Sequence, residues 1–281
     1  MTRHVLVPPL LLFQLGQPYA PVAPDPGVLV VAERAFARDA AEHGSRAAFL
    51  AHMGEGSVVF EPAPVDARAT WEARPEGPGR LSWAPAHAEI AASADLGFTT
   101  GPWEFRPDPE SDPVAFGEYA TVWRKDAAGS WKFAADIGIS HGPHAGEPGV
   151  PVLASAGPVP DLTATPADVL RAERAFVRAA IGDVERAYRE HAAPDVLLLR
   201  EGSPRAEGRK AAIRLAARHP RRWEPWEALL SEAGDLGVVY GIARPAEGAD
   251  PAGYLRVWRR RPGEGWRIAL DVATSPPPGG P

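Results

Sequence analysis

Apolar positions along the chain first recur at helical spacing and then alternate at strand spacing, and this succession occurs twice. Each half opens with a helix whose apolar residues are three to four positions apart. These residues are Leu29, Ala32 and Phe36 in the first half and Val169, Ala172 and Phe176 in the second. Glu33, Arg34 and Arg38 fall between the apolar positions of the first helix, so we expect them to face solvent.

Two shorter helices and a set of strands follow in each half. A second helix is predicted over 46–52 and 184–191, where Ser45 and Asp183 would cap the first backbone N–H groups. A third helix is clear over 208–218 and weaker over 67–74. Alternation and Gly, Pro and Asp turns predict strands at 57–60, 88–93, 96–101, 115–124 and 131–139, and at 196–199, 228–232, 236–243, 253–259 and 266–274.

The same residue blocks recur in constant order in the two halves. Ala32-Glu33-Arg34-Ala35-Phe36 returns as Ala172-Glu173-Arg174-Ala175-Phe176, and the later blocks around Trp83, Asp95, Trp123 and Asp136 return around Trp223, Asp235, Trp258 and Asp271. Each repeat is far longer than the roughly 20–50 residues of a solenoid unit. The chain is therefore predicted to hold two domains. We interpret the repeated Asp-Leu-Gly as turn chemistry without a catalytic role.

The domain boundaries follow from composition. Residues 27–141 and 165–274 are the two domains, 142–164 form a linker rich in Gly and Pro, and 275–281 are expected to be a disordered tail. Residues 1–26 form a leader whose basic start and apolar run resemble a short export signal, although Pro8 and Pro9 interrupt the run. Export and a cytoplasmic location are equally open. No stretch approaches the about 20 apolar residues of a membrane span.

The order of elements and the repeated motifs resemble a known superfamily. Each half shows Trp-x-Pro, then Asp-Leu-Gly, then Val-Trp-Arg, Trp and Asp, as in Trp83-Ala84-Pro85, Asp95-Leu96-Gly97, Val122-Trp123-Arg124, Trp131 and Asp136. This pattern is similar to that of the nuclear transport factor two-like (NTF2-like, SnoaL-like) proteins, in a bacterial branch of unknown function. The resemblance implies an α+β fold with three helices packed on a curved antiparallel sheet, and two such cones in this chain. It implies no single activity.

Composition excludes several classes of function. The formal net charge of −6 gives no general attraction to a phosphate backbone, so nucleic acid is not expected as a partner. The chain has no cysteine, which excludes disulfides, thiolate nucleophiles and cysteine-based zinc sites. No phosphate loop, nucleophile elbow or dinucleotide fingerprint is present in the sequence, so no cofactor is expected.

Carboxylates at the base of the cone are the candidate catalytic groups that the resemblance implies. Burial in apolar walls raises the pKa of a carboxylic acid, which can then act as a base near neutral pH. Asp136 and Glu61 are the candidates in the first half, and Asp271 and Glu201 are their equivalents. Strict alternation places Asp136 opposite the face of Trp131 and Phe133, which favours a strand-end carboxylate that pairs with a nearby arginine or caps a turn. Glu61 equally fits an ordinary loop position.

The histidines carry weaker signals. His52 and His191 close the second helices, where the helix dipole favours them, and His87 fits a surface strand. His141 and His144, with Glu147, are residue types that bind metals, but they lie in or beside the Gly/Pro-rich segment without supporting spacing. No metal site is predicted.

Aromatic side chains are the strongest signal for a pocket. The chain has nine tryptophans, of which some belong to the core because large aromatics dominate burial. Others would suit a flat apolar or aromatic ligand. The residues expected to line the cones are Trp71, Trp83, Tyr119, Trp123, Trp223, Tyr254 and Trp258.

Two functions remain open at the level of sequence. The first is a pocket for a small apolar or aromatic molecule, which is either bound or transformed by acid–base chemistry without a cofactor, as an isomerase, dehydratase or cyclase would do. The second is a non-catalytic scaffold in which the copies pack sheet to sheet as an intrachain pseudo-dimer; a homo-oligomer is also open. The first copy, with the fuller motif, is the favoured active one.

Overall fold

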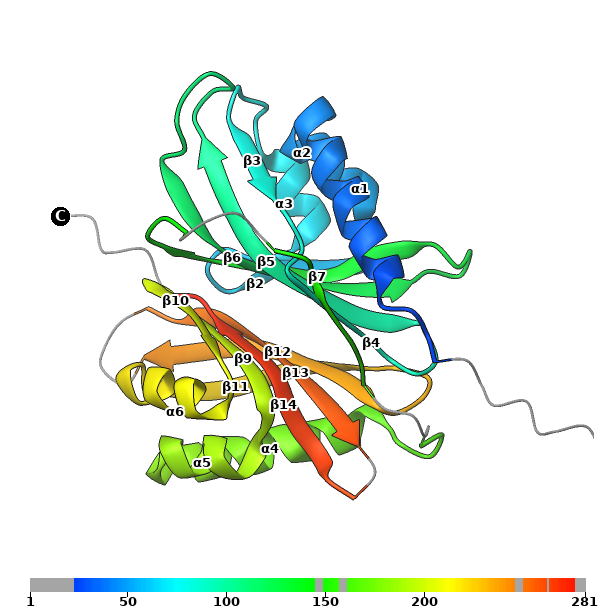
Figure 1. Cartoon of the computed structure of the whole chain (residues 1–281), viewed down its shortest axis with the longest axis vertical. Helices are drawn as coiled ribbons and strands as arrows, with labels where there is room; N and C mark the ends of the chain where they lie inside the picture. The colour runs from blue at the N-terminus through cyan, green and yellow to red at the C-terminus, as the bar shows by residue number, and fades with distance from the viewer. Residues whose placement is uncertain (1–22, 145–148, 157–160, 246–249, 262, 276–281) are drawn as a thin grey trace, which may run out of the picture.

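The computed structural model describes residues 23–144, 149–156, 161–245, 250–261 and 263–275, which form two α+β domains (Figure 1). Each domain has three helices that cover one face of its sheet. The helices are α1 (Gly27–His43), α2 (Ser45–His52) and α3 (Ala67–Ala73), then α4 (Pro166–Gly182), α5 (Val184–His191) and α6 (Arg209–Arg218). Among the described residues no helix is long and apolar enough to cross a membrane.

The sheet of the first domain follows the order β2-β1-β7-β6-β5-β4-β8, and β3 pairs with β5. Its strands are β1 (Met53–Phe60), β2 (Pro64–Asp66), β3 (Arg80–Trp83), β4 (His87–Ile90), β5 (Leu96–Arg106), β6 (Ala115–Lys125), β7 (Trp131–His141) and β8 (Val152–Ser155). The sheet was expected to be antiparallel throughout, but β1 runs parallel to β7 and β4 parallel to β8.

The second domain repeats this plan with the order β10-β9-β14-β13-β12-β11. Its strands are β9 (Ala192–Arg200), β10 (Ser203–Glu207), β11 (Arg221–Leu230), β12 (Leu236–Pro245), β13 (Ala252–Arg261) and β14 (Gly265–Ala273). The only parallel neighbours on this path are β14 and β9, as in the equivalent pair of the first domain. The predicted α+β fold class with two copies is confirmed.

Several elements differ from the sequence prediction. The short strands β2, β3 and β10 were not expected, because they are too short to show alternation. β8 lies inside the segment predicted to be a linker and extends the first sheet by pairing with β4. The predicted leader is described only from residue 23, and the predicted tail only at Ser275, so both predictions lie almost wholly outside the described residues.

The two sheets pack against each other, and the helices lie on the outer faces (Figure 1). One continuous apolar cluster joins them, and the transfer of this surface from water is the main force holding the domains together. From the first domain it includes Phe98, Val122, Ile137 and Ile139, and from the second Leu199, Val238, Val257 and Val272.

The repeated Asp-Leu-Gly turns exchange hydrogen bonds across this interface. The backbone N–H of Ala92 donates to Asp235 Oδ2 at 2.9 Å, and that of Glu232 donates to Asp95 Oδ2 at 3.0 Å. These two bonds join equivalent atoms of the two repeats in opposite directions. Each aspartate therefore caps the turn of the other domain, which is the reciprocal contact that a two-fold interface produces.

A β-bulge in the last long strand of each domain determines which side chains face the helices. In β7 the pairing with β6 shifts between Val122 and Trp123, so Ala134 is an extra residue. Phe133 and Asp136 consequently point to the same face, toward the helices, whereas strict alternation predicts opposite faces. The second domain has the same shift between Val257 and Trp258. The bulge is why the prediction that Asp136 faces away from the helical core was wrong.

Candidate functional site

A cavity of about 180 Å³ lies between the helices and the sheet of the first domain. Its walls are mostly aromatic. The lining residues are Phe36, Phe49, Leu81, Trp83, Trp103, Tyr119, Asp136 and Gly138. They come from α1, α2, β3, β5, β6 and β7, so the complete fold is needed to assemble the chamber.

Asp136 is the carboxylate that lines this cavity. Its Oδ2 accepts a hydrogen bond from the Thr121 hydroxyl at 2.7 Å across the β6–β7 pair. Burial raises the pKa of Asp136 to about 7, the Thr121 bond opposes the rise, and the Glu33 carboxylate adds to it. A carboxyl group in this state exchanges its proton near neutral pH, as a general acid or base must.

Glu33 lies behind the cavity and holds its aromatic wall in place. The side chain is fully buried (0% exposed), whereas the helical pattern predicts that it faces solvent. Its carboxylate accepts the indole N–H of Trp83 at 2.5 Å and that of Trp123 at 2.9 Å, and the Thr99 hydroxyl. Burial raises the pKa of Glu33, and these donors oppose the rise. The hydrogen bonds explain how a glutamate is tolerated in an apolar core.

Tyr119 places a buried hydroxyl group at the wall of the cavity. Its hydroxyl is buried and has no hydrogen-bond partner among the described residues. Burial raises the pKa of Tyr119 well above its ordinary value, so the hydroxyl remains protonated and can donate. Because β6 and β7 pair Thr121 with Asp136 and Tyr119 with Gly138, these four residues share one face of the sheet. The cavity thus offers a donor and a titratable carboxyl on one wall.

Trp103 separates the chamber from a larger hollow of about 690 Å³. The two cavities share Leu81 and Trp103 as lining residues, and the larger one also includes Trp71 and Arg74. The Trp103 indole donates to the carbonyl of Ile139 at 3.1 Å, and its ring lies over Gly117, where an added Cβ would come within 2.6 Å of it. A glycine at this position is what lets the indole lie against the sheet.

Glu61, the other sequence candidate, lies outside the small chamber. It forms an ion pair with Arg74, and both side chains are 43% exposed. Arg74 in turn stacks on Trp71, with its guanidinium carbon 4.3 Å from the ring centroid. The structure places Glu61 in a surface pair beside the larger hollow, and it does not bring Glu61 and Asp136 together.

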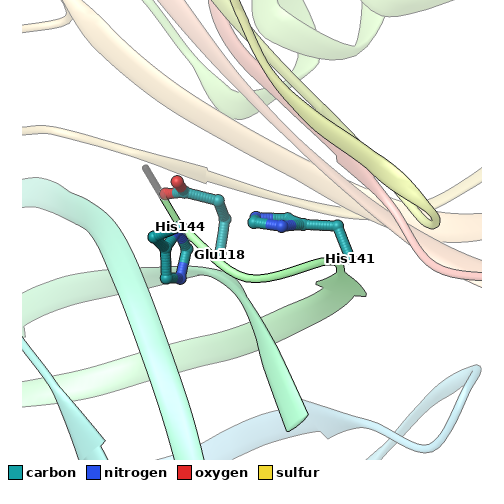
Figure 2. A group of neighbouring side chains, drawn as sticks. All are labelled: Glu118, His141 and His144. Carbon is teal, nitrogen blue, oxygen red and sulfur yellow. The ribbon is translucent and has the colours of Figure 1, made fainter. Parts of the chain in front are cut away.

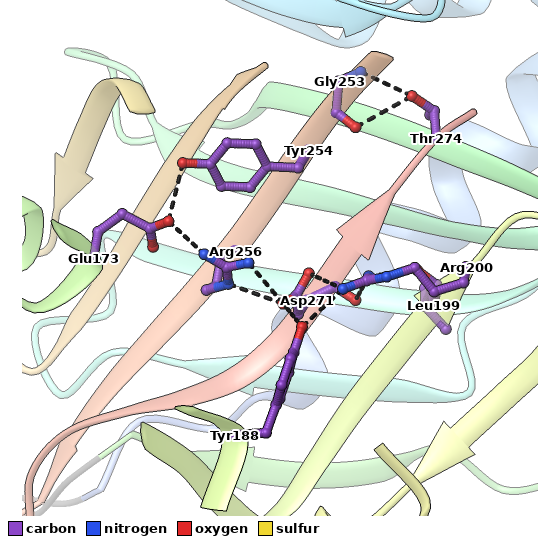
Figure 3. A network of polar contacts seen from close by, with 9 residues as sticks. All are labelled: Glu173, Tyr188, Leu199, Arg200, Gly253, Tyr254, Arg256, Asp271 and Thr274. Carbon is purple, nitrogen blue, oxygen red and sulfur yellow. Dashed lines mark hydrogen bonds and ion pairs between the residues drawn. The ribbon is translucent and has the colours of Figure 1, made fainter. Parts of the chain in front are cut away.

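The equivalent carboxylate of the second domain lies in a different environment, shown in Figure 3. Asp271 is bound by Arg256 at 2.8 Å and by Arg200 at 3.0 Å, and it accepts a hydrogen bond from the Tyr188 hydroxyl at 2.5 Å. Burial opposes its ionisation, but the two guanidinium groups outweigh burial and keep the pKa of Asp271 below its ordinary value. The two arginines therefore favour the ionised form of this aspartate.

Arg256 occupies the space that is hollow in the first domain. Its guanidinium group also pairs with Glu173, and it lies 4.2 Å from the centroid of Phe176 and 4.6 Å from that of Trp223. Thr121, a much smaller residue, stands at the equivalent place in the first domain. The second cone is therefore filled by its own ion pairs.

The remaining predicted pocket residues belong to the packed cores. Trp123, Tyr254 and Trp258 are fully buried, and the last two hydrogen-bond to Glu173 at 3.0 and 2.8 Å. Trp223 packs edge-on against Tyr254. Only Trp83 and Tyr119 of the seven predicted lining residues border the 180 Å³ cavity, and Trp71 borders the larger hollow.

The other histidine and carboxylate candidates also lie away from the small chamber. His52 pairs with Asp39 at 2.6 Å, and His87 stacks on Phe98. His191 borders a surface hollow beside Trp266. Glu201 accepts the backbone N–H of Ser140 at 3.1 Å in the domain interface. His52, His87 and Glu201 thus each make a structural contact outside the chamber.

Glu33 and Thr121 are functional candidates that sequence reasoning missed. The sequence contains a signal for Glu33, because the Ala-Glu-Arg-Ala-Phe block that holds it is identical in the two repeats. A glutamate that faces solvent has no structural reason to be the same in both. Thr121 and Arg256 each stand directly before the repeated Val-Trp-Arg motif, so they occupy equivalent positions in the two repeats. The difference between these two residue types is the sequence signal that the two cones have different interiors.

The chain matches no protein-family model and no curated protein. It is similar to solved structures that each cover 39–40% of it. An NTF2-like protein of unknown function from Shewanella oneidensis MR-1 is 11% identical, covers 39% of this chain and 98% of its own, and has a TM-score of 0.32. A putative polyketide cyclase from Sinorhizobium meliloti is 19% identical, with the same coverage and a TM-score of 0.30.

A putative ketosteroid isomerase from Parabacteroides distasonis is 14% identical and covers 40% of this chain and 89% of its own, with a TM-score of 0.33. A Catenulispora acidiphila structure in complex with S-DNPA is 18% identical, covers 39% of this chain and 91% of its own, and has a TM-score of 0.32. At such identities the similarity concerns the fold alone.

Proposed function

We propose that the first domain binds a small, largely apolar or aromatic molecule in its cone and that Asp136 transfers a proton to or from it. The observation that carries the proposal is a carboxyl group whose pKa is raised to about 7 in an aromatic cavity. Such a group matches the requirement of general acid–base catalysis at neutral pH. The reaction class is therefore isomerisation, dehydration or cyclisation by proton transfer.

The side chains around Asp136 have separate roles in the proposed site. The Tyr119 hydroxyl, which has no partner among the described residues, is the donor for an oxygen of the ligand. The ring of Trp83, fixed by Glu33, provides a flat apolar wall. A developing enolate oxygen would be stabilised by a donor held in a site with little water.

The sizes of the two cavities suggest how a ligand would be held. The small chamber, about 180 Å³, is below the roughly 300–1,000 Å³ of pockets for drug-sized ligands. We infer that only the reacting end enters it, while the rest of the molecule lies in the hollow beyond Leu81 and Trp103.

A thermal-shift screen of the full chain with aromatic and steroid-like metabolites tests binding. A ligand at 100 times its Kd stabilises a protein by about 2.7 kcal/mol. Gly138→Val should abolish the thermal shift, because it places a branched side chain in the chamber. The variant should still fold, since the added Cβ would lie 3.6 Å from Trp103 Nε1 and 4.0 Å from Glu118 O, which are ordinary contact distances. Glu61→Gln is the matched control and should keep the shift.

Turnover of any hit then tests the chemistry. Asp136→Asn should bind the ligand and lose at least about 100-fold in rate, which is the lower range for general acid–base catalysis. Full turnover by Asp136→Asn would contradict the role of the carboxyl group, and a hit whose shift survives Gly138→Val would contradict the site.

The second candidate function is a non-catalytic scaffold, which the filled second cone and the reciprocal turn contacts favour. In this alternative both domains serve to present an outer surface. A screen without hits, on a chain that unfolds cooperatively, is the outcome that supports it.

A further inference from the structure

A second group of chemically active side chains lies at the far end of β7, away from Asp136. Glu118 on β6, His141 at the end of β7 and His144 just beyond it have ligand atoms that all lie within 4.8 Å of one another. Figure 2 shows the imidazole of His141 directed toward Glu118, with His144 beside the Glu118 side chain. The two imidazole rings pack edge to face, with their centroids 4.8 Å apart. Of the ligand set considered from sequence, Glu147 lies outside the described residues, and Glu118 was not anticipated.

Backbone carbonyls define which nitrogen of each histidine faces the group. His141 Nδ1 lies 2.6 Å from the carbonyl of Gly142, and His144 Nε2 lies 3.3 Å from that of Trp103. A carbonyl oxygen only accepts, so each of these nitrogens carries the proton. His141 Nε2 and His144 Nδ1 are consequently left with lone pairs. A histidine whose other N–H donates to a carbonyl is the usual arrangement of a metal ligand.

His141 Nε2 is a buried atom without a hydrogen-bond partner among the described residues. A buried polar atom that lacks a partner costs about 1–3 kcal/mol, so its environment calls for a donor or a cation. This is an observation independent of the clustering, and it concerns the nitrogen that the Gly142 contact leaves unprotonated.

Glu118 is held in place from the second domain. Arg205 on β10 donates to Glu118 Oε2 at 3.2 Å, and Arg205 is itself paired with Glu207. Glu118 is buried, with a side chain that is 7% exposed. The ion pair orients the carboxylate and leaves Oε1 without a hydrogen bond among the described residues.

We propose that Glu118, His141 and His144 bind one divalent transition-metal ion, with Zn²⁺ as the preferred ion. Two imidazole nitrogens and one carboxylate oxygen suit Zn²⁺ and exclude a Mg²⁺ or Ca²⁺ site, which takes oxygen ligands. Three protein ligands leave a fourth position for water or a ligand atom. A tetrahedral ion with bonds of about 2.0–2.1 Å brings its ligand atoms to roughly 3.4 Å, so small side-chain rotations complete the site.

Among the described residues, the site has no equivalent in the second domain. The residue of the second repeat equivalent to Glu118 is Gly253. Trp103 connects the site to the cone, because its carbonyl binds His144 and its indole lines the cavity of Asp136. The proposal does not rest on the proposed function, since ion binding can be measured without a substrate.

Calorimetric titration of the chelator-treated full chain with Zn²⁺ at pH 7.5 tests the proposal. We expect one ion per chain, visible ligand-field absorption with Co²⁺, and no binding of Mg²⁺ at the same concentration. His141→Ala, His144→Ala and Glu118→Gln should each weaken Zn²⁺ binding by at least about tenfold, because loss of even an outer partner costs 10–100-fold.

His43→Ala is the matched control. His43 belongs to another group with Asp39 and Glu42 on helix α1, where His43 and Glu42 are exposed, and its loss should leave the affinity unchanged. Circular dichroism of each variant separates loss of a ligand from loss of the fold. The proposal is overturned if Zn²⁺ does not bind, or if folded His141→Ala and His144→Ala bind it as tightly as the original chain.

Discussion

Thr121 and Arg256 occupy equivalent positions beside Asp136 and Asp271, and their difference in size and charge explains why the two cones differ. Thr121 donates one neutral hydrogen bond and leaves space, whereas Arg256 fills the space and neutralises the carboxylate. Equivalent aspartates thus have pKa values shifted in opposite directions, upward to about 7 for Asp136 and downward for Asp271. At the residue scale, the raised pKa of Asp136 depends on the absence of a cation beside it.

Thr121→Arg should convert the first cone into a copy of the second. A neighbouring guanidinium group lowers the pKa of an aspartate by about 1–3 pH units, so we expect the pKa of Asp136 to fall toward its ordinary value. Carboxyl NMR titration measures the change. Thr121→Val, which removes the hydrogen bond without adding charge, should move the pKa upward, and a downward shift in that variant would contradict the assignment.

Asp136 should also make folding stability depend on pH. In the folded chain the carboxyl group keeps its proton up to about pH 7, whereas in the unfolded chain it loses it near 3.8. The folded state binds more protons between these values, so this contribution is complete below about pH 4 and is lost as pH rises through 7. Asp136→Asn should therefore gain stability relative to the original chain as the pH rises. We expect the difference in unfolding free energy, variant minus original, to be roughly 2–4 kcal/mol larger at pH 8 than at pH 4.

Urea unfolding at the two pH values measures this difference. Glu61→Gln, which alters an exposed surface pair, is the control and should show little change. An equal effect of Asp136→Asn at pH 4 and pH 8 would show that the carboxyl group does not titrate in this range.

At the scale of elements, the β-bulges and the reciprocal turns carry the most information. The bulge at Ala134 turns Asp136 into the cone, and the loop at Asp95 binds the other domain. Both features arise from single residues, and they determine where the candidate site and the interface lie.

Asp235→Ala should weaken the contact between the domains. The change leaves the partly buried N–H of Ala92 without its acceptor and also removes the bond from the buried Ser231 hydroxyl at 2.9 Å, so a cost of about 1–3 kcal/mol is expected. Differential scanning calorimetry should show the two domains unfolding at more widely separated temperatures. Asp126→Ala removes a turn cap within the first domain only and should not separate the two transitions.

The sequence predicts the elements well and the site only in part. Long periodic segments such as α1 and the β6–β7 hairpin were found, because several residues repeat the pattern. The burial of Glu33 and the orientation of Asp136 were missed, since partners on distant strands satisfy the first and an irregular pairing produces the second. His141 and Glu118 are far apart in sequence, and only the sheet brings them together.

At the scale of the whole molecule, a buried ion pair crosses between the domains. Arg259 on β13 binds Glu89 on β4 at 3.1 Å, and the two side chains are only 3% and 1% exposed. Asp195 also pairs with Arg259. Breaking a buried pair leaves a charge without compensation and costs about 3–5 kcal/mol. The apolar contact between the sheets thus includes one point where charge specifies the alignment.

Glu89→Gln and Arg259→Gln, singly and together, test this pair in a double-mutant cycle. We expect each single change to destabilise the chain by about 3 kcal/mol and the double change to cost clearly less than their sum. The loss should be nearly the same in low and high salt, because buried pairs are little screened. Strict additivity would show that the two side chains do not interact energetically.

The exchanged bonds of Asp95 and Asp235 have a consequence for the history of the chain. Two identical subunits related by a two-fold axis make every contact twice, once in each direction. The paired bonds have this form, so we infer that the ancestor was a homodimer of single domains. In a homodimer every mutation appears twice, and an arginine at the position of Thr121 would have closed both cones at once. In a single chain that carries both copies, the two positions can differ, so one cone is filled by ion pairs while the other keeps its cavity.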